Sequence, residues 1–149
     1  MSRIELETRI DAPPERCFDL SRSVELHLEA AAATDERAVD GVTSGLLGAE
    51  DTVTWEARHL GRSWRLTVRI TAYDRPRSFR DEQVRGPFRS FVHDHFFEPA
   101  GGGTRMRDVL EVASGFPLVD WLVLDPHLRR FLRRRNELIR TTAEQRSRV

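Results

Sequence analysis

The chain has 149 residues, of which 39% are hydrophobic and 32% charged, and its 24 basic and 24 acidic residues cancel in charge. This length is enough to bury a core, so we expect one domain over residues 1–149. All basic residues are arginine and Cys17 is the single cysteine, which excludes lysine Schiff bases, P-loop lysines, intramolecular disulfides and thiolate metal sites.

The charge balance also bears on partners and location. A net charge of zero disfavours a protein that coats nucleic acid. The first residues alternate polar and apolar instead of forming a signal segment, and no stretch approaches the roughly 20 apolar residues of a membrane span. We therefore expect a cytoplasmic protein with no nucleic-acid partner and no stable membrane insertion, and a homodimer stays open.

The chain begins with a strand and two short helices. Apolar and polar side chains alternate over residues 2–10, which predicts a half-buried strand. Pro13 and Pro14 favour the first turn of a helix over residues 15–22, and a second helix is predicted over residues 24–33.

Residues 52–59 and 62–72 form the first predicted hairpin, with a two-residue loop at Leu60-Gly61. That loop length fixes which residues lie opposite one another, and it separates apolar pairs from a charged pair on the other face. The predicted apolar pairs are Val53–Val68, Trp55–Leu66 and Ala57–Trp64, and the charged pair is Glu56–Arg65.

Three further strands are predicted over residues 78–85, 89–98 and 104–114, the last two joined by a turn with three consecutive glycines. Counting back from the turns gives the register across these strands. Four polar side chains then share the inward face with apolar neighbours. The predicted opposite pairs are Phe79–His95, Asp81–His93 and His95–Asp108.

The last part of the chain is predicted to be helical. Residues 117–124 are apolar and contain Trp121, and Asp125 followed by Pro126 is typical of a helix start, so we expect the helix to restart or kink there. Five arginines between residues 129 and 135 are interpreted as a solvated face, with a nucleic-acid or anionic-membrane surface as the alternative. Helical spacing predicts an inward stripe of Leu128, Phe131, Leu132, Arg135, Leu138, Ile139 and Thr142.

This order of elements predicts an α+β fold. A curved antiparallel sheet of about six or seven strands is expected to wrap around the long C-terminal helix, with the two short helices after the first strand closing one end. Because one helix rarely fills such a concave face, we expect a cavity between the sheet and the helix.

The element order and two segments resemble the START-like helix-grip superfamily, also called SRPBCC or polyketide cyclase/dehydrase-like. The two segments are Ile10-Asp11-Ala12-Pro13-Pro14 and the pattern FVHDHFFEPAGGGTRMRDVLEV from Phe91 to Val112. Val112 departs from the family pattern, in which an aromatic residue is usual. The resemblance implies a helix-grip fold with a deep, mostly apolar ligand cavity, and it does not fix one reaction.

The four inward polar residues, Asp81, His93, His95 and Asp108, are the candidate site. As hydrogen-bonded pairs they would support the fold, orient a ligand oxygen, or carry out acid/base catalysis, and the sequence leaves these three roles open. Two histidines at positions i and i+2 with carboxylates nearby are only a weak zinc or iron signature, so we expect no metal and no nucleotide cofactor. His95 and Asp108 are expected within hydrogen-bonding reach of each other.

We expect a small hydrophobic ligand, lipid-, polyketide- or isoprenoid-like, to bind in the cavity. The alternatives are a cyclase or dehydratase that uses a His–Asp pair, and a protein-interaction module without a ligand. The catalytic candidates are His93, His95, Asp81 and Asp108. The predicted ligand-binding residues are Trp55, Trp64, Phe79, Phe91, His93, His95, Phe97, Met106, Asp108, Trp121 and Phe131.

Overall fold

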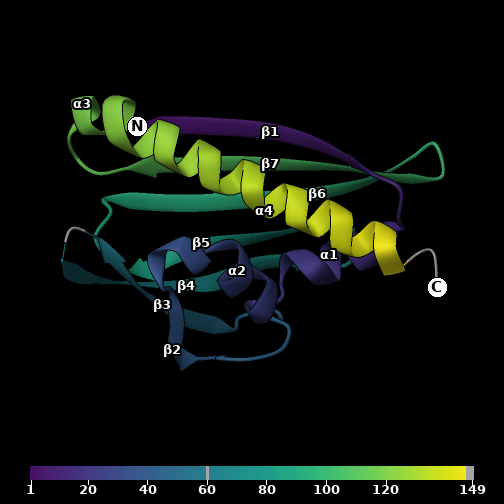
Figure 1. The fold of residues 1–149 in the computed structure, drawn as a ribbon, viewed down its shortest axis with the longest axis horizontal. Helices are drawn as coiled ribbons and strands as arrows, with labels where there is room; N and C mark the ends of the chain where they lie inside the picture. The colour runs from purple at the N-terminus through teal and green to yellow at the C-terminus, as the bar shows by residue number, and fades with distance from the viewer. Residues whose placement is uncertain (60, 147–149) are drawn as a thin grey trace.

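The computed structural model describes residues 1–59 and 61–146, in which seven strands form one curved antiparallel sheet (Figure 1). The order across the sheet is β1-β7-β6-β5-β4-β3-β2. Leu60 of the predicted two-residue loop lies outside the described residues. The strands are β1 (Ser2–Ile10), β2 (Arg37–Gly41), β3 (Thr52–His59), β4 (Arg62–Asp74), β5 (Ser78–Arg85), β6 (Ser90–Ala100) and β7 (Gly103–Ala113).

The helices gather on the concave side of the sheet. The long helix α4 crosses this face diagonally and packs against β1, α1 and α2 (Figure 1), so the predicted helix-grip arrangement is confirmed. None of the helices in the described part of the chain combines the length and hydropathy needed to span a bilayer. The helical elements are α1 (Pro14–Ser21), α2 (Val24–Ala30), η1 (Ala32–Thr34), α3 (Pro117–Val119), the π-helical turn η2 (Asp120–Leu124) and α4 (Asp125–Arg146).

The register that the turn lengths predict is confirmed. Trp55 lies opposite Leu66 in the β3–β4 hairpin, and His95 lies opposite both Phe79 and Asp108 in the neighbouring strands. Because side chains alternate across a strand, this register brings the four polar candidates to the concave face.

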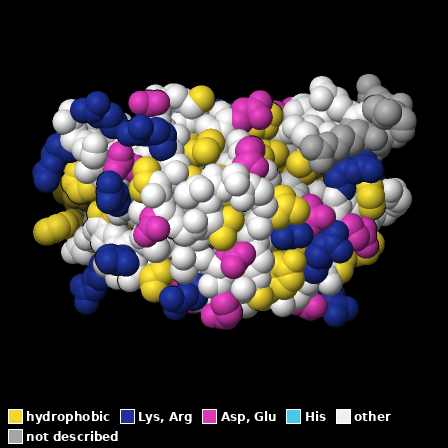
Figure 2. All heavy atoms as spheres, turned by 90° about the horizontal axis from the view of Figure 1, so that it is seen from below, with side chains coloured by type: hydrophobic (Ala, Val, Ile, Leu, Met, Phe, Trp, Pro, Cys, Tyr) yellow, Lys and Arg dark blue, Asp and Glu magenta, His cyan; other side chains and the backbone are white. Residues whose placement is uncertain are grey.

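The convex face carries ion pairs between neighbouring strands. Glu56 accepts hydrogen bonds from Arg65 at 2.8 Å and Arg37 at 3.2 Å, and Arg80 pairs with Asp94 at 2.7 Å. Each exposed pair adds little to stability. Together they keep opposite charges side by side, and Figure 2 accordingly shows Arg and acidic side chains interspersed over one face of the molecule.

The core fills the concave face unevenly. At the α1 end, the fully buried ring of Phe18 meets Tyr73, Phe79 and Phe97 edge-on, with centroid distances of 5.4, 5.2 and 5.3 Å. A smaller cluster lies toward the start of α4, where Leu132 is buried but Phe91 is only partly buried. The concave face is therefore tightly closed at the α1 end and less so at the other. Three further partly buried side chains pack against the smaller cluster, namely Leu6, Leu128 and Phe131.

Of the two predicted outcomes at Asp125, a restart or a kink, the helix does not restart but continues through this residue from an irregular π turn that ends at Leu124. Asp125 has helical backbone angles (φ −57°, ψ −55°), and its N–H donates to the carbonyl of Asp120, five residues earlier. Pro126 has no N–H and cannot continue the regular ladder, and the π turn absorbs this defect with one extra residue. One residue corresponds to a rotation of about 100° about the helix axis, which changes the side of the molecule that the preceding segment faces.

Candidate functional site

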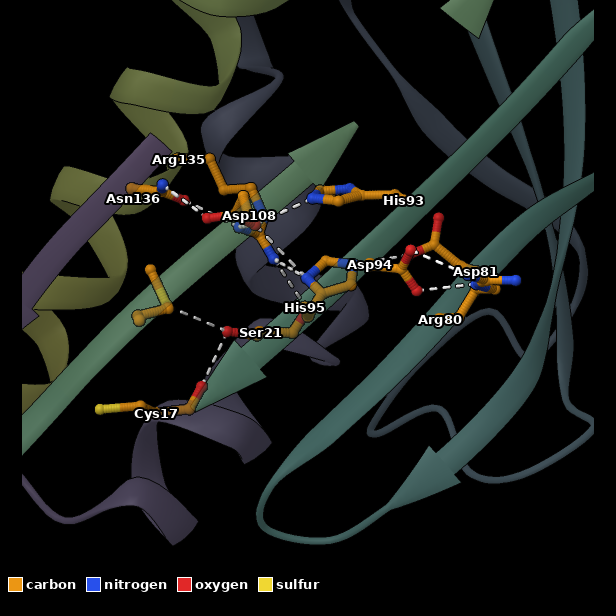
Figure 3. A network of polar contacts seen from close by, with 11 residues as sticks. Cys17, Ser21, Arg80, Asp81, His93, Asp94, His95, Asp108, Arg135 and Asn136 are labelled. Atoms are coloured by element: carbon orange, nitrogen blue, oxygen red, sulfur yellow. Dashed lines mark hydrogen bonds and ion pairs between the residues drawn. The ribbon is translucent and has the colours of Figure 1, made fainter. Parts of the chain in front are cut away.

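A buried polar network lies between the sheet and α4 (Figure 3). Strands β5, β6 and β7 contribute the four predicted residues, and α4 adds two that the sequence did not single out, Arg135 and Asn136. These two are only 4% and 3% exposed. The place of Arg135 on the inward stripe could have indicated its burial. It was missed because the four other arginines between residues 129 and 134 led to the interpretation of the whole run as a solvated face. The network consists of Asp81, His93, His95, Asp108, Arg135 and Asn136.

The two histidines pair with carboxylates diagonally across the strands. Nε2 of His93 lies 2.8 Å from Oδ1 of Asp108, and Nε2 of His95 lies 2.7 Å from Oδ2 of Asp81. His95 and Asp108 lie opposite each other as predicted, but Nδ1 and Oδ1 are 3.5 Å apart and each residue makes its hydrogen bond to another partner.

Ring stacking explains the diagonal pairing. The imidazoles of His93 and His95 stack with centroids 3.7 Å apart, and His95 stacks on Phe79 at 4.0 Å. Stacked rings lean along the strand, so each histidine reaches the carboxylate opposite its neighbour on the same face. The three rings form a continuous stack across the concave face.

Helix α4 supplies the cation and the amide that pair with the carboxylate of Asp108. Arg135 approaches Oδ1 of this carboxylate at 3.3 Å and Asn136 donates to Oδ2 at 2.8 Å. Arg135 also donates to the side-chain oxygen of Asn136 at 2.8 Å. Burial alone would raise the pKa of Asp108, but the guanidinium of Arg135 and then the hydrogen bond from His93 outweigh it and hold the pKa well below its usual range. Asp108 is therefore a buried, permanently ionised anchor between sheet and helix.

His95 is held neutral. Burial, followed by the field of His93, lowers its pKa to about 4 despite the hydrogen bond to Asp81, which acts in the opposite direction. Its Nδ1 lies 3.3 Å from Nη2 of Arg135, which can only donate. The neutral tautomer that fits is therefore protonated on Nε2, donating to Asp81 and accepting from Arg135. Both ring nitrogens of His95 are thus already engaged.

Asp81 and His93 differ from His95 because each has one polar atom without a hydrogen bond among the described residues. His93 bonds only through Nε2 and Asp81 only through Oδ2. No buried side-chain nitrogen or oxygen in the described part of the chain lacks a partner, so Nδ1 of His93 and Oδ1 of Asp81 must reach solvent-accessible space. Asp81 is accordingly 15% exposed at its side chain. These two atoms are the ones that an incoming molecule can contact.

The same residues bear on metal binding. One possible ligand atom each from Asp81, His93 and His95 lies within 4.8 Å of the others. The guanidinium of Arg135 hydrogen-bonds to His95 in this group and repels a cation, and carboxylates already engage one nitrogen of each histidine. The arrangement suits protons and hydroxyl groups better than a divalent metal.

The predicted apolar lining divides into three groups. Trp55, Phe79, Phe97 and Met106 are buried in the core, and Phe91 and Phe131 are partly buried. Trp121 is 70% exposed, so its predicted inward placement was wrong. Trp64 lies opposite Ala57, on the face of the hairpin that carries Trp55, but it is 38% exposed. Trp64 lies at the outer end of its hairpin, and Trp121 lies within the π turn η2, which rotates its segment outward.

The predicted cavity between sheet and α4 stays a prediction. Two hollows, of about 330 and 160 Å³, lie on the convex face. Their walls come from outward-facing residues such as Arg69 and Glu82 in the first and Thr67 in the second. Phe91 borders the first hollow, and no other predicted ligand-binding residue borders either one.

Solved structures with the same architecture are similar over nearly the whole chain. The protein TTHA0849 from Thermus thermophilus is 21% identical with a TM-score of 0.70, and the match covers 95% of this chain and 99% of that one. Ara h 8.0201 is 17% identical with a TM-score of 0.71, covering 95% and 97%. Major latex-like protein 151 from Panax ginseng is 16% identical with a TM-score of 0.69, covering 95% and 97%. At these identities the similarity concerns the fold alone.

Comparison of the sequence with protein families goes beyond the fold. No curated protein matches the chain in sequence. The family model described as polyketide cyclase / dehydrase and lipid transport, however, matches residues 1–144. That range takes in every strand of the sheet and every residue of the buried network, including the two from α4. The chain therefore belongs to the polyketide cyclase / dehydrase and lipid transport family.

Proposed function

We propose that this protein binds a small, mostly apolar molecule that carries a hydroxyl group, on the concave face between the sheet and α4. The observation that supports this most directly is Nδ1 of His93, a ring nitrogen in a buried residue that has no partner among the described residues and reaches accessible space. Lipid-, polyketide- and isoprenoid-like molecules all fit this description. A cytoplasmic location belongs to the same proposal.

The surroundings of His93 supply the apolar part of the site. Phe91 lies two residues earlier on the same face of β6, and it packs together with Phe131 of α4 against the smaller core cluster. His27 of α2 stacks on Trp55 at 3.9 Å and meets Phe131 edge-on at 5.6 Å. The partly buried rings of His27 and Phe131 form a contact between α2 and α4, which would have to open when a ligand enters.

The polar chemistry favours a hydroxyl donor. The carboxylate of Asp108 accepts a hydrogen bond from Nε2–H of His93, so Nδ1 carries a lone pair whenever the ring is neutral. The free oxygen of Asp81 is also an acceptor. A ligand hydroxyl can donate to either atom, whereas a ligand of hydrocarbon alone would leave both unpaired at a cost in affinity.

A matched pair of probes tests the proposal. We expect 2-naphthol to bind the wild-type protein about 2–10-fold more tightly than naphthalene, which is the gain from one hydrogen bond. In His93→Gln and Asp81→Asn this preference should shrink, whereas in Asp94→Asn, on the opposite face of β6, it should persist. Fluorescence titration of the probes, with thermal melts to verify folding, measures it. Equal affinities for both probes in the wild type would contradict the proposal.

A second candidate is catalysis by the same histidine, favoured by its pairing with Asp108. A carboxylate that fixes Nε2–H leaves the other nitrogen as a general base. In a cyclisation, Nδ1 of His93 would take a proton from the carbon beside a ketone, the carbon would bond to a second carbonyl, and that oxygen would regain the proton. Turnover of a linear 1,5-diketone, lost in His93→Gln but retained in Asp94→Asn, would support this. Absence of turnover in the wild type would leave binding as the function.

A further inference from the structure

The segment from Phe116 to Val123, here called the outward apolar segment, turns its hydrophobic side chains to solvent. Trp121 is 70% exposed, Phe116 68% and Leu118 64%. Leu122 and Val123 are also more than half exposed. The one residue of the segment that is fully buried is polar, namely Asp120. This is the reverse of the pattern expected for a helix on the surface of a water-soluble domain.

Asp120 fixes the segment in this orientation. Its carboxylate accepts a hydrogen bond from the backbone N–H of Ser114 at 2.8 Å and pairs with the N-terminal amine at 3.1 Å. Its carbonyl accepts from the hydroxyl of Ser2 at 3.1 Å. The π turn adds the rotation that points Trp121 away from the sheet. The exposed apolar side chains are therefore held in place by the fold, on the side where no described element covers them.

Positively charged side chains follow the outward apolar segment along α4. Arg130, Arg133 and Arg134 of α4 are exposed and form no ion pair with any described residue. Asp125, an acidic residue nearby, is paired with Arg129 at 3.2 Å. At 1.5 Å per residue, the arginines lie roughly 12–18 Å along the axis from Leu122.

We propose that this end of the molecule docks on a membrane surface containing anionic lipids. The outward apolar segment would lie in the interface with Trp121 at headgroup level, and the arginines of α4 would contact lipid phosphates. An anionic lipid surface fits better than a protein partner because it needs no matching polar groups beyond anions, and the segment offers none. Docking of this kind is reversible and adds to the proposed function without depending on it.

Vesicle co-sedimentation tests the proposal. We expect the protein to bind vesicles of 70% phosphatidylcholine and 30% phosphatidylglycerol, and to bind pure phosphatidylcholine at least tenfold more weakly. Trp121→Ser with Leu122→Ser should weaken binding about tenfold or more, since two apolar side chains no longer enter the interface. Arg130→Gln with Arg133→Gln and Arg134→Gln should remove the preference for anionic vesicles and its salt dependence.

Matched controls alter exposed residues elsewhere. Val39→Ser with Leu46→Ser changes two exposed apolar residues away from this end, and Arg58→Gln with Arg69→Gln and Arg85→Gln changes three exposed arginines on the convex face. Both control proteins should bind vesicles like the wild type. The proposal is overturned if wild-type protein stays in the supernatant with anionic vesicles. It is also overturned if Trp121→Ser with Leu122→Ser instead converts a dimer into a monomer in light scattering, because the segment would then be an interface between two copies.

Discussion

Protonation of His95 tests the electrostatics of the buried network. In the folded protein its pKa is about 4, whereas in the unfolded chain a histidine has a pKa near 6.5. Between these values the unfolded chain holds a proton that the folded protein excludes. Stability is therefore fully present above about pH 6.5 and falls as the pH drops toward 4.

The size of the effect follows from the two pKa values. Between pH 7.5 and 4.5 the wild type should lose about 2–3 kcal/mol of unfolding free energy through His95 alone. The lowered pKa values of Asp81 and Asp108 act in a different window. A carboxylate with a depressed pKa contributes stability that is present above about pH 4 and is lost only below it.

Urea unfolding at several pH values, for the wild type and for His95→Gln, measures this. The amide of glutamine can donate to Asp81 as neutral His95 does, and it does not titrate, so the variant should lack this part of the acid destabilisation. If His95→Gln retains the full loss of stability between pH 7.5 and 4.5, His95 is not neutral in the folded protein and the assignment of its tautomer is wrong.

Three further outcomes can be checked by equilibrium unfolding and labelling. Arg135→Met should cost about 3–5 kcal/mol because it leaves the buried carboxylate of Asp108 without its cation, whereas Arg134→Met on the exposed face should change stability by less than about 0.5 kcal/mol. Leu132→Ala should cost about 2–5 kcal/mol, and Phe131→Ala less, about 1–2 kcal/mol, because its ring is only partly buried; equal costs would show that both positions are packed alike. Burial raises the pKa of Cys17, so iodoacetamide should label it only in denaturant, and rapid labelling of the native protein would contradict this.

The sheet could be predicted because its turns are short. Gly61 in the first hairpin and Gly101 and Gly102 in the turn after Ala100 have positive φ, which glycine adopts without strain. Turns of fixed length leave one register in which apolar residues share a face, and a shift by one residue would bury Glu56 in place of Trp55. The position of His95 between Phe79 and Asp108 therefore followed from counting.

The hydrogen bonds within that register could not be predicted in the same way. Register gives opposite residues, but the partner of a side chain depends on the direction in which its ring leans. The stack of Phe79, His95 and His93 sets this direction, and it moves each imidazole one pair along the strand. Arg135 was hidden for another reason, because its burial depends on Asp108, which is 27 residues away in sequence.

The π turn shows how a single local defect redirects a surface. In an uninterrupted α-helix, Trp121 lies eleven residues before Leu132, close to three full turns, and would face the sheet with it. Pro126 has no N–H to donate to the carbonyl of Leu122, and the turn before it is wound with one extra residue, so that the N–H of Asp125 donates to the carbonyl of Asp120. The inward position is then taken by Asp120, whose carboxylate pairs with the N–H of Ser114 and with the N-terminus, and the apolar residues turn outward.

Replacing Pro126 by Ala would allow the regular ladder to form. If tertiary contacts of Asp120 are what hold the segment, the fluorescence of Trp121 should stay that of an exposed indole in this variant. If the proline alone imposes the turn, the emission should shift to shorter wavelength as Trp121 rotates inward.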